Sequence, residues 1–222
     1  MTEPLSTHAP PPAEGGAVAG LQSDSTFLVS ACGLQPDDPI IDVGGASSSP
    51  VAAWVSAGYR DISVLDEDLE ALEALHKRLG EKAQSVTFLQ MPVLQFRPHR
   101  RYALWHDRGV FHRLVHPDDR QAYVEIVQQA LRPEGSLVIT TFGPEGPDRY
   151  DGAPVVRYSA RTLPAELGSQ FELAEHSLAV HRLGSSGGQQ LLRCRFRRHA
   201  PQWPSAAAAV GADDPAPSRR PS

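Results

Sequence analysis

The stretch that most constrains the fold of this 222-residue chain covers residues 39–51 and reads PIIDVGGASSSPV. An apolar, β-branched run stops at Asp42 and two glycines, and then passes through serines to Pro50. β-Branched residues favour strands, glycine permits a tight turn, and proline suits the first position of a helix. The sequence therefore predicts a strand, a tight turn and a helix over 51–57, with Ser49 as the N-cap.

A second acid follows the next predicted strand. Residues 62–65 lead into Asp66, 24 positions after Asp42. In α/β folds a carboxylate roughly 20 residues on accepts hydrogen bonds from ribose hydroxyls. The alternative is that Asp66 caps the helix beginning near Asp68. We prefer the ribose role, because Asp66 ends a strand in a strand-helix-strand frame.

Composition limits the chain to one domain. Residues 1–22 and 201–222 are rich in proline, alanine and glycine and poor in large apolar residues, so both are expected to be disordered. The remaining residues, 23–200, are enough for one core. The net charge of −5 argues against general binding of nucleic acid, which is therefore not an expected partner.

The sequence contains no pattern typical of export, of a membrane anchor or of a metal site. No apolar run approaches the length of a membrane span, and no basic segment followed by an apolar run opens the chain. Cys32 and Cys194 form no disulfide framework, and the nine histidines lack metal-ligand spacing. We expect a cytoplasmic protein without a membrane anchor or a metal site.

The order of predicted elements indicates a mostly parallel sheet covered by helices on both faces, closed by an antiparallel hairpin. Apolar runs predict the strands, and apolar residues at helical spacing predict the helices. The helices are expected at 23–33, 68–79, 117–131 and 161–167, besides 51–57, and the strands at 40–43, 62–65, 86–90, 102–105, 136–142, 171–181 and 189–197.

Apolar residues and arginines alternate along the last predicted strand and therefore lie on its two opposite faces. Leu192, Cys194 and Phe196 are predicted to face the core, and Arg193, Arg195 and Arg197 to lie on a solvated face. The alternative for the arginines, a nucleic-acid surface, is less favoured because no aromatic side chains interleave them.

Six separated segments carry a family resemblance, and they lie in the same order as in that family: 41–45, 58–66, 104–112, 130–135, 142–147 and 154–158. The chain resembles the class I S-adenosylmethionine-dependent methyltransferases. This resemblance implies a Rossmann-like, doubly wound α/β fold with a seven-stranded sheet ordered 3-2-1-4-5-7-6. It also implies S-adenosyl-L-methionine as cofactor and methyl transfer by in-line displacement. The methyl acceptor, a small molecule or a protein side chain, is left open.

The resemblance also implies roles for single residues. Asp66 would hold the ribose diol. His106 and Asp107 would face the sulfonium and the incoming nucleophile, and His112 is either a second base or a packed residue. The cofactor-binding residues would be Asp42, Gly44, Gly45, Ala46, Asp66, Glu67, Pro92 and Trp105.

Several positions depart from the family pattern. Ala46 and Ser48 replace glycines, and a positive φ at Ala46 would cost about 1 kcal/mol. Pro92 replaces the acid that reaches the adenine amino group, and residues 1–22 contain no aromatic lid. A catalytically silent binding or partner module is therefore the alternative function. A nicotinamide-dependent oxidoreductase is disfavoured by the hairpin and the missing third glycine.

Overall fold

The computed structural model describes residues 22–48, 50–182 and 188–200. Nearly all of the predicted disordered segments and the N-cap assigned to Ser49 lie outside these residues. The strands are β1 (Ile40–Val43), β2 (Ile62–Asp66), β3 (Val86–Gln90), β4 (Tyr102–Arg108), β5 (Leu131–Phe142), β6 (Arg149–Tyr150), β7 (Ala153–Pro154), β8 (Phe171–Arg182) and β9 (Gly188–Arg198). The α-helices are α1 (Gln22–Ser30), α2 (Val51–Ser56), α3 (Leu69–Leu79), α4 (Pro117–Ala130) and α5 (Thr162–Leu167), and 3-10 turns include η2 (Ala46–Ser48), η4 (Val93–Gln95) and η5 (Phe111–Arg113).

Seven strands form one sheet in the order β3-β2-β1-β4-β5-β9-β8. The first five strands pair in parallel, and β9 pairs antiparallel with both β5 and β8. This is the predicted order with its predicted antiparallel ending. The small β6-β7 hairpin was not predicted, because the glycine- and proline-rich stretch 143–154 was interpreted as a loop.

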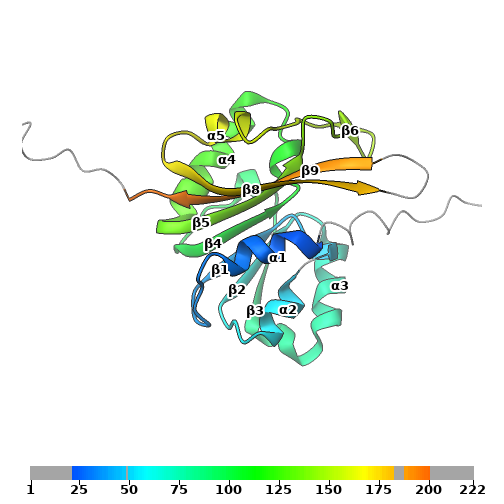
Figure 1. Ribbon diagram of the computed structural model, residues 1–222. Helices are drawn as coiled ribbons and strands as arrows, with labels where there is room; N and C mark the ends of the chain where they lie inside the picture. Colours follow the sequence, from blue (N-terminus) through cyan, green and yellow to red (C-terminus); the bar gives the residue numbers. More distant parts are fainter. Residues whose placement is uncertain (1–21, 49, 183–187, 201–222) are drawn as a thin grey trace, which may run out of the picture.

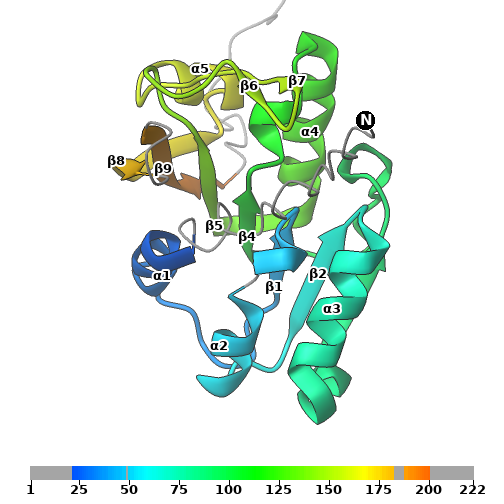
Figure 2. The ribbon, with the colours of Figure 1, turned by 90° about the vertical axis from the view of Figure 1, so that its right-hand side faces the viewer.

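Helices cover both faces of the sheet (Figures 1 and 2). One face packs against α1, α2 and α3, and the other packs against α4 and α5. In α3, Leu72, Leu75 and Leu79 are buried at helical spacing, and the Asp68 side chain caps the helix by accepting from the Ala71 amide at 3.1 Å. Leu69, at the start of the same helix, is exposed.

Strand β4 is three residues longer than predicted. Its last residues pair with both neighbours: His106 lies beside Asp42 of β1 and Val138 of β5, and Arg108 lies beside Thr140 of β5. The polar residues at the end of β4 therefore lie inside the sheet rather than in a loop above it.

The arginines of β9 do not share one solvated face, which corrects the prediction. Arg193 is fully buried, Arg195 is mostly buried and pairs with Glu175 at 2.7 Å, and Arg197 is exposed. The reason is that α1 packs against β5 and β9 on this side of the sheet.

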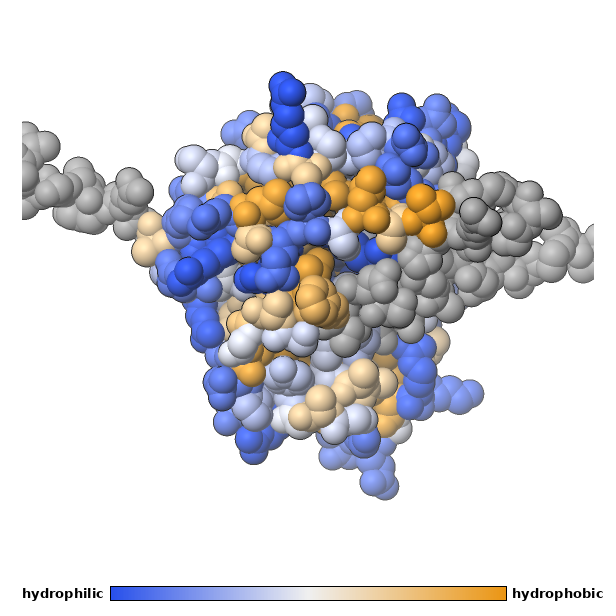
Figure 3. All heavy atoms as spheres, in the orientation of Figure 1, coloured by the Kyte–Doolittle hydropathy of each residue, from blue (hydrophilic) through white to orange (hydrophobic). Residues whose placement is uncertain are grey.

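The edge strand β8 presents apolar side chains to solvent. Leu178 and Val180 are more than half exposed, and Figure 3 shows apolar side chains gathered over this strand among polar ones. Among the described residues, no helix has the length and apolar character needed to cross a membrane.

Candidate functional site

The turn after β1 requires glycine at its first position. Gly44 has a φ of 69°, and a Cβ there would lie 1.9 Å from Cγ2 of Val110, in the loop after β4. L side chains rarely adopt this backbone conformation, and no side chain fits in this space. The turn after β1 and the loop after β4 are therefore in direct contact.

The next two residues join this turn to β2 and β4. The Ala46 amide donates to Oδ2 of Asp66 at 3.0 Å, and Nη2 of Arg108 donates to the Gly45 carbonyl at 2.6 Å. The positive φ expected at Ala46 is not found, because Ala46 begins the 3-10 turn η2. The replacement of glycine by alanine at this position is thus free of the expected backbone strain.

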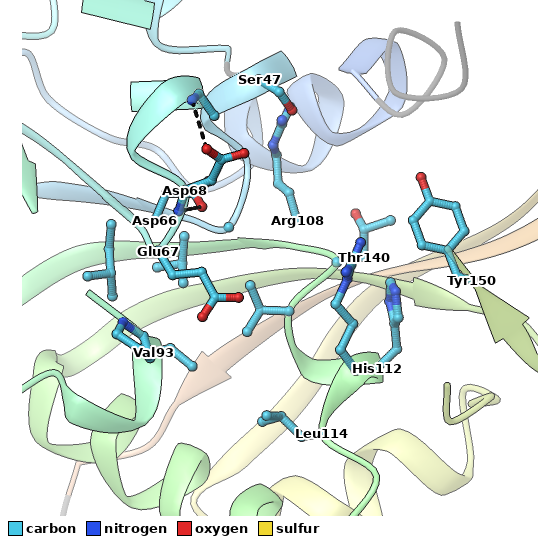
Figure 4. Close-up of a pocket in the computed structure, with 18 of the residues that line it drawn as sticks. Ser47, Asp66, Glu67, Asp68, Val93, Arg108, His112, Leu114, Thr140 and Tyr150 are labelled. Carbon is cyan, nitrogen blue, oxygen red and sulfur yellow. Dashed lines mark hydrogen bonds between the residues drawn. The ribbon is translucent and has the colours of Figure 1, made fainter. Parts of the chain in front are cut away.

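A cavity of about 560 Å³ lies at the carboxyl ends of β1, β2, β4 and β5 (Figure 4). Its volume is within the range of small-molecule pockets, roughly 300–1,000 Å³. Ligands of open α/β sheets bind at this edge. The residues that line it are Val43, Gly44, Ser47, Leu65, Asp66, Glu67, Asp68, Ala71, Met91, Pro92, Val93, Leu94, Arg108, Gly109, Val110, His112, Arg113, Leu114, Thr140, Phe142, Tyr150, Asp151, Gln189 and Leu191.

The predicted site residues divide into two groups. Those that line the cavity are Gly44, Asp66, Glu67, Pro92 and His112. Those that do not line it are Asp42, Gly45, Ala46, Trp105, His106 and Asp107. In this second group, His106 and Asp107 lie within β4, which continues three residues past its predicted end, while Asp42 lies within β1 and Gly45 and Ala46 lie in the turn after it.

Asp42, His106 and Arg108 form a buried polar cluster between β1 and β4. Oδ1 of Asp42 lies 2.7 Å from Nδ1 of His106 and 3.8 Å from Nε of Arg108. Burial lowers the pKa of His106 against the opposing effect of Asp42, and the His106 ring packs edge-on to Trp54. The cluster braces the two central strands on the side of the sheet that carries α2.

Asp107 anchors the loop after β4 from the opposite face of the sheet. Its carboxylate accepts the Val110 amide at 2.9 Å, the Phe111 amide at 3.2 Å and the hydroxyl of Tyr123 in α4. Tyr123 in turn accepts Nε1 of Trp105 at 3.0 Å. Complete burial raises the pKa of Asp107 to about 6, although these hydrogen bonds favour the ionised form. Asp107 and Trp105 thus hold the floor of the cavity in place.

His112 is the predicted catalytic residue that reaches the cavity. It lies in η5 and is 6% exposed, with its ring centroid 4.6 Å from that of Phe142. Burial, with the nearby charge of Arg113, lowers its pKa to about 3. The nearby Thr140 backbone partly offsets this, but among the described residues neither ring nitrogen has a hydrogen-bond partner of ordinary geometry. His112 is therefore a neutral, buried imidazole facing the cavity at neutral pH.

Sequence reasoning missed the side of the cavity formed by η5, β5 and the β6-β7 hairpin. Arg113 pairs with Asp151 at 3.3 Å, and its guanidinium lies 5.2 Å from the ring centroid of Tyr150. Thr140 also lines the cavity from the end of β5. Arg108 could have been found from the sequence if the polar residues at the end of β4 had been interpreted as part of that strand.

Among the described residues, no group of three or more histidine, cysteine or acidic side chains is placed to hold a metal ion.

Comparisons with solved structures show the fold. Neither a protein-family model nor a curated protein matches the chain. The 1,6-didemethyltoxoflavin-N1-methyltransferase of Burkholderia thailandensis matches 83% of this chain and 80% of its own, with a TM-score of 0.66 and 21% identity. The N-methyltransferase NodS of Bradyrhizobium japonicum matches 78% and 85%, with a TM-score of 0.62 and 16% identity. Both were solved with S-adenosylhomocysteine. The chain therefore has the class I methyltransferase fold, as the resemblance predicted.

Proposed function

We infer that this protein binds S-adenosylmethionine in the cavity at the ends of β1, β2, β4 and β5 and transfers its methyl group to an acceptor. The observation that carries this proposal is the place of Asp66, whose carboxylate lines the cavity at the end of the second strand. The shared fold supports it, since neighbours of this fold were solved with S-adenosylhomocysteine.

The hydrogen bonds of Asp66 leave room for a ribose. One oxygen accepts the Ala46 amide and the other accepts the Asp68 amide at 3.1 Å. A carboxylate offers about four acceptor positions, so two remain for hydroxyl donors. The two hydrogen bonds also fix the orientation of the carboxylate, and with it the direction of its two remaining acceptor positions.

The walls beside Asp66 fit the two ends of such a cofactor. Met91, Val93 and Leu94 form an apolar wall for the adenine, although Pro92 supplies no side-chain acceptor for the amino group. At the other end Arg108 covers Gly45, where a Cβ would lie 2.3 Å from its Nε. The guanidinium, with five donors in a planar fork, suits the methionine carboxylate.

When bound, the cofactor supplies an activated methyl group on a sulfonium. The task of the protein is to position the acceptor and exclude water. In this proposal Asp66 and Arg108 orient the cofactor, and His112 contacts the acceptor. His106 and Asp107 act as positioning residues, through Arg108 and through the loop that carries Val110 and His112.

Replacing Asp66 by asparagine is expected to weaken binding of S-adenosylhomocysteine about 10- to 100-fold, since a hydrogen bond to a charged group contributes about 1.5–3 kcal/mol. Isothermal titration calorimetry measures this, with micromolar affinity expected for the unmodified protein. Asp151→Asn is the matched control, because Asp151 lines the other side of the cavity and is expected to leave this affinity unchanged.

The same titration distinguishes the proposed methyl transfer from the alternative function. Flat heats at high concentrations of S-adenosylmethionine and S-adenosylhomocysteine would contradict cofactor binding and favour the silent binding or partner module. The missing acceptor at Pro92 is the observation that keeps this alternative open.

A further inference from the structure

The lining of the cavity differs between its two sides (Figure 4). The side formed by Asp66, Glu67 and Asp68 is acidic and is assigned above to the cofactor. On the other side are His112 and Tyr150, with Arg108 between the two sides. Because the second side has no part in holding the cofactor, it is available to a second molecule.

Two polar side chains on this second side are buried with little hydrogen bonding among the described residues, since His112 has only the nearby backbone of Thr140. His112 is 6% exposed and Thr140 is 3% exposed, and both line the cavity. Neither the ring nitrogens of His112 nor Oγ1 of Thr140 makes a hydrogen bond of ordinary geometry to the described residues. Buried polar groups are normally hydrogen-bonded, so these atoms indicate a polar ligand that completes them.

The wall beside these groups is aromatic. The ring of Phe142 lies 4.6 Å from that of His112 and 5.5 Å from that of Tyr150, measured between ring centroids. Because Phe142 already contacts both other rings, a flat ligand would pack against this wall rather than insert into it. Aromatic pairs are stabilised in offset and tilted arrangements, which favours a planar ligand here.

The charges on this side leave no site for a cationic acceptor. Arg113 and Asp151 are the charged residues that η5 and the hairpin contribute to the lining of the cavity, and they pair with each other at 3.3 Å. A lysine ammonium would therefore find no unpaired carboxylate on this side. It would also find no base, because the pKa of His112 is lowered to about 3.

We propose that this side of the cavity binds the methyl acceptor, and that the acceptor is an uncharged, planar heteroaromatic molecule held by His112 and Thr140 against the Phe142 wall. This inference rests on the proposed function. In the reaction, a lone pair of a ring nitrogen forms the bond to the methyl carbon while the carbon-sulfur bond breaks and its electron pair returns to sulfur. Any proton on that nitrogen leaves to water, so no protein base is needed.

Ligand-observed NMR on protein saturated with S-adenosylhomocysteine tests the proposal with three probes. Quinolin-4-one is planar and uncharged, benzoate is planar and anionic, and Nα-acetyl-lysine methylamide carries an ammonium. Quinolin-4-one is expected to bind at least tenfold more tightly than either charged probe. Binding should also shift the ring ¹⁵N signals of His112.

Two variants locate the binding. His112→Phe keeps the flat ring but removes both nitrogens, and Thr140→Val removes the hydroxyl at nearly constant shape. Each variant is expected to weaken the binding of quinolin-4-one at least tenfold while leaving the affinity for S-adenosylhomocysteine unchanged. If His112→Phe does not fold, the Thr140→Val variant alone tests where quinolin-4-one binds.

The outcomes separate the two proposals. Equal binding of the lysine probe, no binding of quinolin-4-one, or unchanged binding in both variants would overturn the acceptor assignment while cofactor binding stands. Failure of the protein to bind S-adenosylhomocysteine would overturn the proposed function and this inference with it.

Discussion

Replacing Asp42 by asparagine is expected to lower the free energy of unfolding by about 3–5 kcal/mol, the usual loss when one partner of a buried ion pair is removed. The Asp42 side chain is fully buried and lies against both His106 and Arg108. When the charge of Asp42 is removed, the Arg108 guanidinium stays buried in the same low-dielectric surroundings with one fewer anion nearby. Urea denaturation at pH 7 measures the change.

Asp61→Asn is the control for this experiment. Asp61 pairs with Arg100 at the surface, where both side chains are about a third or more exposed, and such pairs contribute about 0–1 kcal/mol. A loss below about 1 kcal/mol in Asp42→Asn would show that the cluster between β1 and β4 does not hold these strands together.

Lowering the pH from 6.5 to 4 is expected to destabilise the protein by about 1 kcal/mol or more. The pKa of His112 is about 3 in the folded state and 6.5 ordinarily, so across this range the unfolded chain binds a proton that the folded chain does not. Stability from His112 is therefore complete above about pH 6.5 and is lost as the pH falls. The lowered pKa of His106 acts in the same direction.

Asp107 opposes this loss. Its folded pKa is about 6 against an ordinary 3.8, so between these values the folded state binds the extra proton and gains stability as the pH falls. At about 1.4 kcal/mol for each pH unit, His112 loses about 3 kcal/mol of stabilisation between pH 6.5 and 4, and Asp107 gains about 2 kcal/mol over the same range. The histidine effect is thus expected to dominate.

Urea denaturation at pH 7, 5.5 and 4 measures the balance. His112→Phe is expected to lose much less stability on acidification than the unmodified protein, and to gain stability if Asp107 then prevails over His106. Equal losses in the two proteins would show that His112 is not buried in a neutral form.

The positions of the strands were predictable from the sequence because most of them are short apolar runs between turn residues, whereas their order in the sheet followed from the family resemblance. The end of β4 was not predictable in this way. His106, Asp107 and Arg108 look like loop residues, since charged side chains are rarely buried. They are buried here because their partners, such as Asp42 and Tyr123, come from distant positions in the chain.

The candidate site was predictable on one side only. Gly44 and Asp66 follow strands directly, and the carboxyl ends of parallel strands meet at one edge of the sheet. Tyr150 and Asp151 reach the same cavity through a hairpin inside a stretch that resembles a loop. The buried Arg193 shows a related limit, because alternation separates the faces of a strand but does not reveal which face a helix covers.

The anchoring of the loop after β4 has a consequence for how acceptor preference can change. Val110 and His112 stand on a loop whose amides are held by Asp107, and Asp107 is held by Tyr123 on the far side of the sheet. No residue of α4 lines the cavity, so under the proposed function substitutions in α4 are expected to alter acceptor selectivity without contacting a bound molecule. They would offer a second, indirect route to new acceptors that leaves the proposed cofactor contacts unchanged.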